Sequence, residues 1–237
     1  MTTKKIIKIG ILEFQITKHS GQKNLYIRVN PPNGDISVSV PAKTTDRVIK
    51  NFVLSKMPEI VKIQDRMKRQ FRQTKREYVS GETCYYLGKP YMLQVIYKGR
   101  YSEIERASNK IIMTVPEGAS YEKRKKLLIE WYRSELKNIL PMILKQCENK
   151  MRIKINACNI RNMKTRWGSC NISKRNILIN LQLIKKPIEC LEYVLVHEFI
   201  HLFEKNHTNH FKSLLDKYYP AWKEAKQILK DMPLDYI

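Results

Sequence analysis

The sequence predicts an α+β fold, in which a β-rich N-terminal region is followed by a helical domain with a small β-sheet. β-prone runs dominate the first forty-odd residues and return between residues 84 and 115. From Ser120 onward, apolar residues recur at helical spacing, and short strand-like runs interrupt the helices. We therefore predict two parts: residues 1–119, a β-rich region with one basic helix, and residues 120–237, the helical domain.

The N-terminal part reads as strands around a turn and then a helix. Strands are predicted at 12–17, 25–29 and 36–40, with the Pro- and Gly-containing turn 30–34 before the last one. Residues 45–76 have spaced apolar positions and no Gly, which predicts a helix, kinked or split at Pro58. Ten Lys or Arg residues make its outer face basic. Residues 84–97 and 110–115 return to strand-like alternation.

The C-terminal part begins with a long helix, for which Ser120 is a suitable N-cap and Pro141 an interruption. Strands are predicted at 152–161 and 176–183, and they flank the stretch Arg166-Trp167-Gly168-Ser169-Cys170. A further helix starts at Pro187, a favourable first-turn proline, and continues to about Lys205. The sequence shows no internal repeat.

The composition is strongly basic, since 45 Lys and Arg face 22 Asp and Glu and give a net charge of +23. The excess is spread evenly, with +12 before residue 120 and +11 after it. Such a surface is consistent with nucleic acid as a partner, and equally with a merely solvated basic exterior.

Five cysteines without a C-x-x-C pair indicate reduced thiols. Because no run reaches the length of a membrane span and no signal-like apolar segment follows the N-terminus, we expect a cytoplasmic protein without a membrane partner.

The motif that carries chemistry is His197-Glu198-Phe199-Ile200-His201, an H-E-x-x-H pattern inside a predicted helix. The four-residue spacing puts both imidazoles on one helix face, where they can bind one Zn²⁺ per chain. Glu198 between them can accept a proton from water as a general base. Four of the five histidines fall within fourteen consecutive positions, which makes a chance pair less plausible. The motif predicts a zinc-dependent hydrolase.

A catalytic zinc site needs a third protein ligand, and several downstream residues compete for that place. We favour His207, because Asn206 can adopt the left-handed conformation that ends a helix and turns the chain back. The alternatives are His210, at the start of the next helix, and the later carboxylates Asp216 and Glu224.

Several motifs together point to a family: 166–170 (Arg-Trp-Gly-Ser-Cys), 197–202 (His-Glu-Phe-Ile-His-Leu), 206–208 (Asn-His-Thr), Phe211 and 219–222 (Tyr-Pro-Ala-Trp). They resemble the YgjP-like metallopeptidases, a family similar in its core to the SprT-like and WLM proteases. The resemblance implies a zincin-type catalytic domain over residues 120–237, with His197, His201 and His207 as zinc ligands, Glu198 as catalytic residue and a polypeptide substrate. Relatives that cleave DNA-attached proteins connect the basic surface to nucleic-acid-associated substrates.

Several finer expectations follow from these residues. Arg166, Tyr218 and Tyr219 are candidate donors to the oxyanion, and Cys170 is expected to be a packed thiol. An extended peptide is expected beside an edge strand, for which residues 176–183 are the candidate. The alternative function is a nucleic-acid-binding module whose zinc is structural and bound by four protein ligands.

Overall fold

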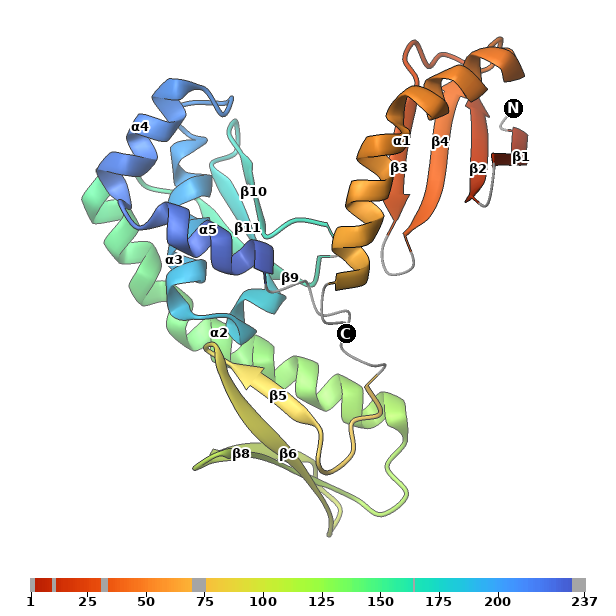
Figure 1. The fold of residues 1–237 in the computed structure, drawn as a ribbon. Coiled ribbons are helices and arrows are strands. Elements are labelled where there is room, and N and C mark those ends of the chain that lie inside the picture. Colours follow the sequence, from red (N-terminus) through yellow and green to blue (C-terminus); the bar gives the residue numbers. More distant parts are fainter. Residues whose placement is uncertain (1–2, 10–11, 31–33, 70–75, 164, 232–237) are drawn as a thin grey trace. The chain divides into compact units, whose positions relative to one another are not determined.

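The computed structural model describes residues 3–9, 12–30, 34–69, 76–163 and 165–231. Their contacts divide the chain into two compact units, Met1–Arg72 and Gln73–Ile237. The fold is α+β, as the sequence predicts (Figure 1). The domain boundary that the sequence suggested, between residues 119 and 120, stays a prediction.

The first unit is a four-stranded sheet covered by one helix. Its strands are β1 (Thr3–Ile9), β2 (Leu12–His19), β3 (Tyr26–Asn30) and β4 (Asp35–Pro41), in the order β1-β2-β4-β3. Helix α1 (Asp46–Arg69) runs continuously through Pro58, so a split there is not observed. The alternate apolar residues of β2 and β4 and one face of α1 form a core of their own: Phe14, Ile16, Ile36, Val38, Val40, Ile49, Val53 and Ile60.

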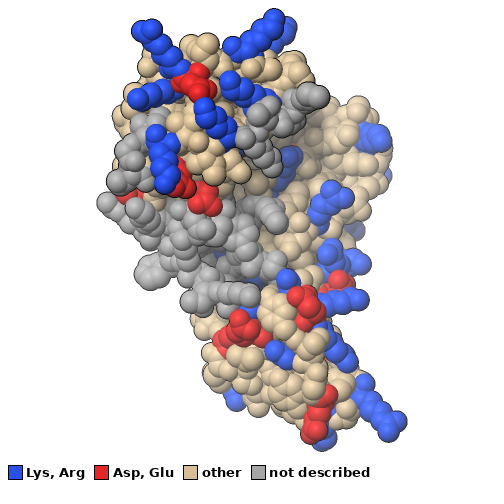
Figure 2. Space-filling view, turned by 90° about the vertical axis from the view of Figure 1, so that its right-hand side faces the viewer, with Lys and Arg blue, Asp and Glu red and all other residues tan. Residues whose placement is uncertain are grey.

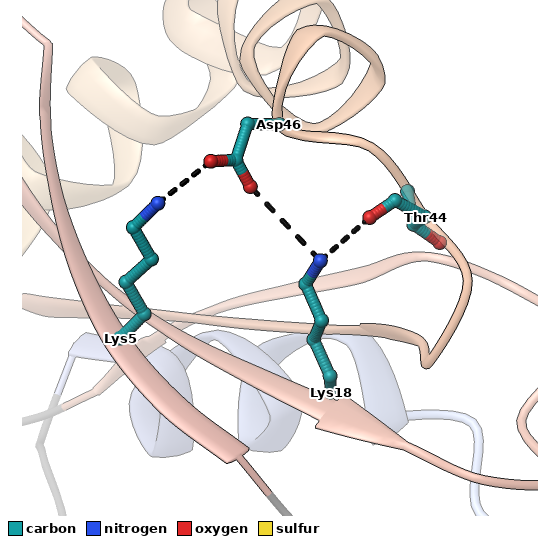
Figure 3. Close-up of polar contacts among 4 residues, drawn as sticks. All are labelled: Lys5, Lys18, Thr44 and Asp46. Atoms are coloured by element: carbon teal, nitrogen blue, oxygen red, sulfur yellow. Dashed lines mark hydrogen bonds and ion pairs between the residues drawn. The ribbon is translucent and has the colours of Figure 1, made fainter.

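Lysines from two strands converge on the first turn of α1 (Figure 3). Lys5 Nζ donates to Asp46 Oδ2 at 2.6 Å, and Lys18 Nζ donates to the Thr44 carbonyl at 2.7 Å. Lys18 also lies 4.0 Å from Asp46 Oδ1. Because a carboxylate near a helix N-terminus is favourable, Asp46 both starts α1 and links it to β1 and β2.

The second unit begins with another four-stranded sheet and a long helix. Its strands are β5 (Thr83–Tyr86), β6 (Lys89–Tyr97), β7 (Glu103–Ala107) and β8 (Lys110–Val115), in the order β5-β6-β8-β7. Helix α2 (Tyr121–Met151) follows, and the side chain of its N-cap Ser120 accepts a bond from Lys123 N, as expected. The interruption predicted near Pro141 is wrong, since α2 continues through it.

The two sheets share one topology, although the sequence shows no internal repeat. In each, the first two strands are antiparallel, the second and fourth parallel, and the third and fourth antiparallel. In each, the helix starts five residues after a proline at the end of the fourth strand, because Pro41 is the last residue of β4 and Pro116 follows β8 directly. The buried positions of that strand alternate in the same way: Ile36, Val38 and Val40, and Ile111, Met113 and Val115. Alternation requires apolar type rather than identity, which hides the repeat in sequence.

The remaining elements build the part that carries the H-E-x-x-H motif. Strands β9 (Ala157–Arg161), β10 (Gly168–Asn171) and β11 (Asn176–Asn180) form a sheet in the order β10-β11-β9. They are followed by the 3-10 helix η1 (Leu181–Lys185) and by α3 (Ile188–Ile200), α4 (Asn209–Tyr218) and α5 (Trp222–Asp231). The edge strand expected at 176–183 is wrong, because β11 is central and β10 is an outer strand.

A tight backbone contact joins the second sheet to the start of α3. Leu87 N donates to the Ile184 carbonyl at 2.8 Å, and Gly88 N donates to the Lys185 carbonyl at 3.2 Å. Gly88 has φ +80°, and a Cβ there would lie 2.7 Å from Pro187 Cγ, so only glycine fits. One hydrophobic core consequently runs from β5–β8 through α2 to α3.

The charged surface is basic without one dominant patch on the face drawn in Figure 2. Lys and Arg side chains are scattered there with Asp and Glu among them. Within the described residues, no helix is long and apolar enough to cross a membrane.

The two cores contain a matched pair of positions that can be mutated separately. Phe14 of the first unit is 0% exposed and pairs with Ile36 of the neighbouring strand. Leu93 of the second unit is also 0% exposed and pairs with Ile111. Phe14→Ala should destabilise the first unit by about 3 to 5 kcal/mol. Because the two cores share no residue, calorimetry should show one unfolding transition moving and the other staying. Leu93→Ala is the matched control and should move the other transition; a shift of both transitions by either variant would contradict the independence of the cores.

Candidate metal centre

Helix α3 is buried on nearly all sides, which is unusual for a helix with two histidines and a glutamate. It packs against α2, α4, α5, β10 and β11. Its buried apolar residues span the whole circumference: Cys190, Leu191, Tyr193, Val194, Leu195, Val196, Phe199 and Ile200. Such all-round apolarity is typical of a central core helix, so the polar side chains on it are held in an apolar environment.

Three imidazoles meet at the C-terminal end of α3. One nitrogen from each of His197, His201 and His207 lies within 4.8 Å of the others, and His197 Nε2 and His207 Nε2 are 2.9 Å apart. Tetrahedral zinc with bonds of about 2.05 Å separates its ligand nitrogens by about 3.3 Å, a value between these two distances. The donor set therefore fits a metal ion.

His207 reaches the cluster by a route that differs from the expected one. Helix α3 ends at Ile200 rather than near Lys205, and tight turns follow, with Phe203 N and Glu204 N both donating to the Ile200 carbonyl at 2.9 Å. Asn206 does not adopt the left-handed conformation. The early helix end is thus made by a 3-10-type bond from Phe203 and an α-type bond from Glu204 to the same carbonyl, which close the last turn without a special residue.

The surroundings orient the imidazoles. His201 Nδ1 lies 3.2 Å from the Glu204 carbonyl; with the proton on Nδ1 it donates there and leaves Nε2 unprotonated toward the cluster. His197 Nδ1 is buried and has no hydrogen-bond partner among the described residues. The ring of Phe211, 1% exposed, lies under all three histidines at centroid distances of 4.7 to 4.9 Å. Phe211 is thus a buried apolar side chain that contacts all three imidazoles, a role that the sequence did not suggest.

The electrostatics keep His197 and His201 neutral. Burial, together with the neighbouring His201 and His207, lowers the pKa of His197 to about 3. Burial also lowers the pKa of His201. Since only neutral imidazole can bind a metal, the site is prepared for binding before any ion arrives.

Glu198 is 5% exposed on the same helix. Burial raises its pKa to about 7, and the positive charge of Arg166 opposes that rise. The backbone of Gly168 lies against its side chain, because a Cβ at Gly168 would be 2.6 Å from Glu198 Oε1. Arg166 and Gly168 therefore border Glu198, although they are thirty residues earlier in the chain.

The competing ligands lie elsewhere. Among the described His, Cys, Asp and Glu residues, only the three histidines form a group able to hold a metal. His210 is exposed on α4, and Glu224 is exposed on α5. Asp216 Oδ1 accepts a hydrogen bond from Trp222 Nε1 at 2.7 Å, which joins α4 to the start of α5.

Two further sequence candidates have structural contacts of their own. Burial raises the pKa of Cys170 to about 11, which fits a packed thiol on β10. The Tyr219 hydroxyl lies within hydrogen-bond distance of the Glu189 carbonyl and Glu192 Oε2, at 3.1 and 3.2 Å. Of the three candidate oxyanion donors, Arg166 is the one whose charge acts on Glu198.

Comparison with known proteins gives this geometry a family. No curated protein sequence matches the chain. Among solved structures, the chain is similar to the metallopeptidase zymogen abylysin of Pyrococcus abyssi (20% identity, TM-score 0.35, 39% of this chain and 90% of that one). It is also similar to the zymogen jannalysin of Methanocaldococcus jannaschii (25% identity, TM-score 0.32, 37% and 88%). The model of the YgjP-like metallopeptidase domain matches residues 23–232. The chain therefore belongs to the YgjP-like metallopeptidase family.

Proposed function

We propose that this chain is a zinc metallopeptidase in which His197, His201 and His207 bind one Zn²⁺ and Glu198 is the general base. The observation that carries the proposal is the convergence of three imidazole nitrogens within 4.8 Å at the end of a buried helix. Family membership supplies the coarser statement, a metallopeptidase acting on polypeptides. The identity of the metal and the roles of the residues are our inference.

Zinc is the ion that the donor set favours. Three neutral imidazoles and no described carboxylate in the group suit Zn²⁺ better than the oxygen-preferring Mg²⁺ or Ca²⁺. Three protein ligands also leave one tetrahedral position open, which distinguishes a catalytic site from a closed structural one.

The chemistry divides between the metal and Glu198. When bound, zinc supplies Lewis-acid activation of water and of the scissile carbonyl. Glu198 accepts the proton of the attacking water and passes it to the leaving amine nitrogen. Burial of Glu198 among apolar residues of α3 limits competing solvent, and Arg166 is the side chain we assign to the developing negative charge.

The substrate would lie as an extended peptide along the outer edge of β10. Within the part of the chain that the structure describes, that strand pairs with β11 on one side only, and it packs against α3. An unpaired strand edge offers backbone donors and acceptors to an added strand. If the peptide is bound through its backbone in this way, the preference for particular substrate sequences would depend on pockets for the peptide's side chains.

Association with nucleic acid receives less support. A structural zinc module would require a fourth protein ligand, and the described residues supply three. The positive charge is scattered on the face of Figure 2, which fits a generally basic surface. Charge by itself selects no particular polyanion.

The metal-ligand assignment predicts that elemental analysis of the purified chain finds one zinc. His207→Ala should weaken zinc binding more than the roughly 10- to 100-fold that is typical when a residue contacting a ligand, rather than a ligand itself, is replaced. His210→Ala, three positions away and exposed, is the control and should keep full zinc content. Retention of zinc by His207→Ala together with its loss from His210→Ala would reverse the assignment.

The general-base assignment is tested by Glu198→Gln. This variant should keep one zinc, because the three imidazoles are unchanged. It should lower kcat on a quenched fluorescent peptide library by about 100-fold or more. Glu192→Gln is a matched control on the same helix, where Glu192 Oε2 lies 3.2 Å from the Tyr219 hydroxyl. That control should stay within a few-fold of wild type; undiminished turnover in Glu198→Gln would remove the general-base role.

A further inference from the structure

Gly168, the first residue of β10, lies closer to α3 than any other residue type would permit. A Cβ at this position would be 2.6 Å from Glu198 Oε1, 2.9 Å from Glu198 Cγ and 2.9 Å from Val194 Cγ1. Contacts of Cβ atoms below 3.0 Å are essentially never observed. Gly168 does not have a positive φ, so its backbone conformation is open to other residues. The need for glycine here is therefore one of space alone.

The backbone before Gly168 is held by hydrogen bonds from one buried residue, Asn180. Asn180, 0% exposed, donates through Nδ2 to the carbonyls of Met163 and Arg166, both at 2.8 Å. Its backbone N donates to the Trp167 carbonyl at 2.9 Å. Its Oδ1 accepts from the backbone N of Met163 at 3.3 Å and of Gln182 at 3.1 Å. Because the two carbonyls preceding Gly168 are both held by Asn180, the strand has little freedom to retreat from α3.

The opposite side is equally constrained. Val194 and Glu198 lie one turn apart on α3, are 4% and 5% exposed, and face the start of β10. Helix α3 is packed on nearly all sides, so it too has little freedom to move. An atom added between the two elements must therefore displace the part that can rotate, which is the Glu198 carboxyl group.

We propose that Gly168 is a positioning residue for Glu198: the bare backbone at the start of β10 sets where the carboxyl group lies, and Asn180 holds that backbone in place. The inference rests on the proposed function, in which Glu198 is the general base. It also gives a role to the Arg-Trp-Gly stretch at 166–168. Arg166 places a positive charge near the Glu198 carboxylate, and Gly168 limits the space beside it.

The test is Gly168→Ala in the full chain, with zinc content, unfolding temperature and kinetics measured together. One added methyl should displace the carboxyl group by about 1 Å, which is expected to lower kcat by roughly 100-fold. KM should change little, and zinc content should stay at one, because the limiting contacts are to Glu198 and Val194 and not to the histidines. A crystal structure of the variant should show the Glu198 side chain rotated.

Two comparisons separate positioning from general destabilisation. Gly118→Ala is the control, since its φ of +73° makes alanine strained while nothing lies within 4 Å of the new Cβ. It should lower the unfolding temperature and leave kcat unchanged. Adding Val194→Ala to Gly168→Ala removes the contact to Val194 but leaves the 2.6 Å contact to Glu198 Oε1, so kcat should stay low. Unchanged kcat in Gly168→Ala, or a loss that Val194→Ala relieves, would overturn the inference.

A second variant addresses the anchor and covers the case in which Gly168→Ala does not fold. Asn180→Asp is isosteric but replaces the two Nδ2 bonds with oxygen facing two carbonyls, so kcat should fall at retained zinc content. Asn156→Asp is its control, because Asn156 Nδ2 donates to the exposed Lys174 carbonyl at 3.0 Å. Equal kcat in both Asn variants would contradict the role of Asn180. If Glu198→Gln is inactive while these variants are fully active, the general base stands and the positioning inference falls; if Glu198→Gln is active, the proposed function itself fails.

Discussion

The structure depends on the burial of α3, a helix that carries polar groups through an apolar core. Uncompensated polar groups in such a place are costly, and charged ones more so. The helix meets this constraint with imidazoles whose pKa burial lowers, and with a carboxyl whose pKa burial raises to about 7. His197 Nδ1, buried and without a partner among the described residues, shows that the compensation is incomplete. That residual cost is tolerated, in our proposal, for the sake of a site that binds a metal without rearrangement.

Other elements of the second unit keep α3 in position. The Leu87–Gly88 turn donates two backbone hydrogen bonds to η1, directly before α3 begins. The long helix α2 packs on the same core, which extends to the sheet β5–β8. A ββββα arrangement thus supports α3, and the first unit repeats the arrangement around a separate core. The repeat suggests that this arrangement is a stable module in its own right, since each copy buries one sheet face under one helix.

The backbone of Met163 and Arg166 shows how one buried amide can organise a site. Asn180 uses both side-chain donors and its acceptor on these two residues and on η1, so their backbone is held in place without regular secondary structure. Gly168 then brings bare backbone against Glu198. Among the described residues this outer strand pairs on one side only, so the substrate binding and the positioning of Glu198 that we propose involve the same element.

The sequence by itself determined the α+β class, the helix with its two histidines one turn apart, and the Ser120 cap, because these depend on periodicity and local spacing. It favoured His207 as third ligand, which stays a prediction; in the structure His207 lies beside His197 and His201, and the expected helix end at Asn206 was wrong. Only the tertiary structure decided that β11 is central, that Phe211 lies under the three imidazoles, and that Gly168 contacts Glu198. The physical reason is that these facts depend on strand order and on contacts between residues thirty positions apart. Local propensity contains no information on such contacts, and the repeat was hidden because alternating burial preserves apolar character and not residue identity.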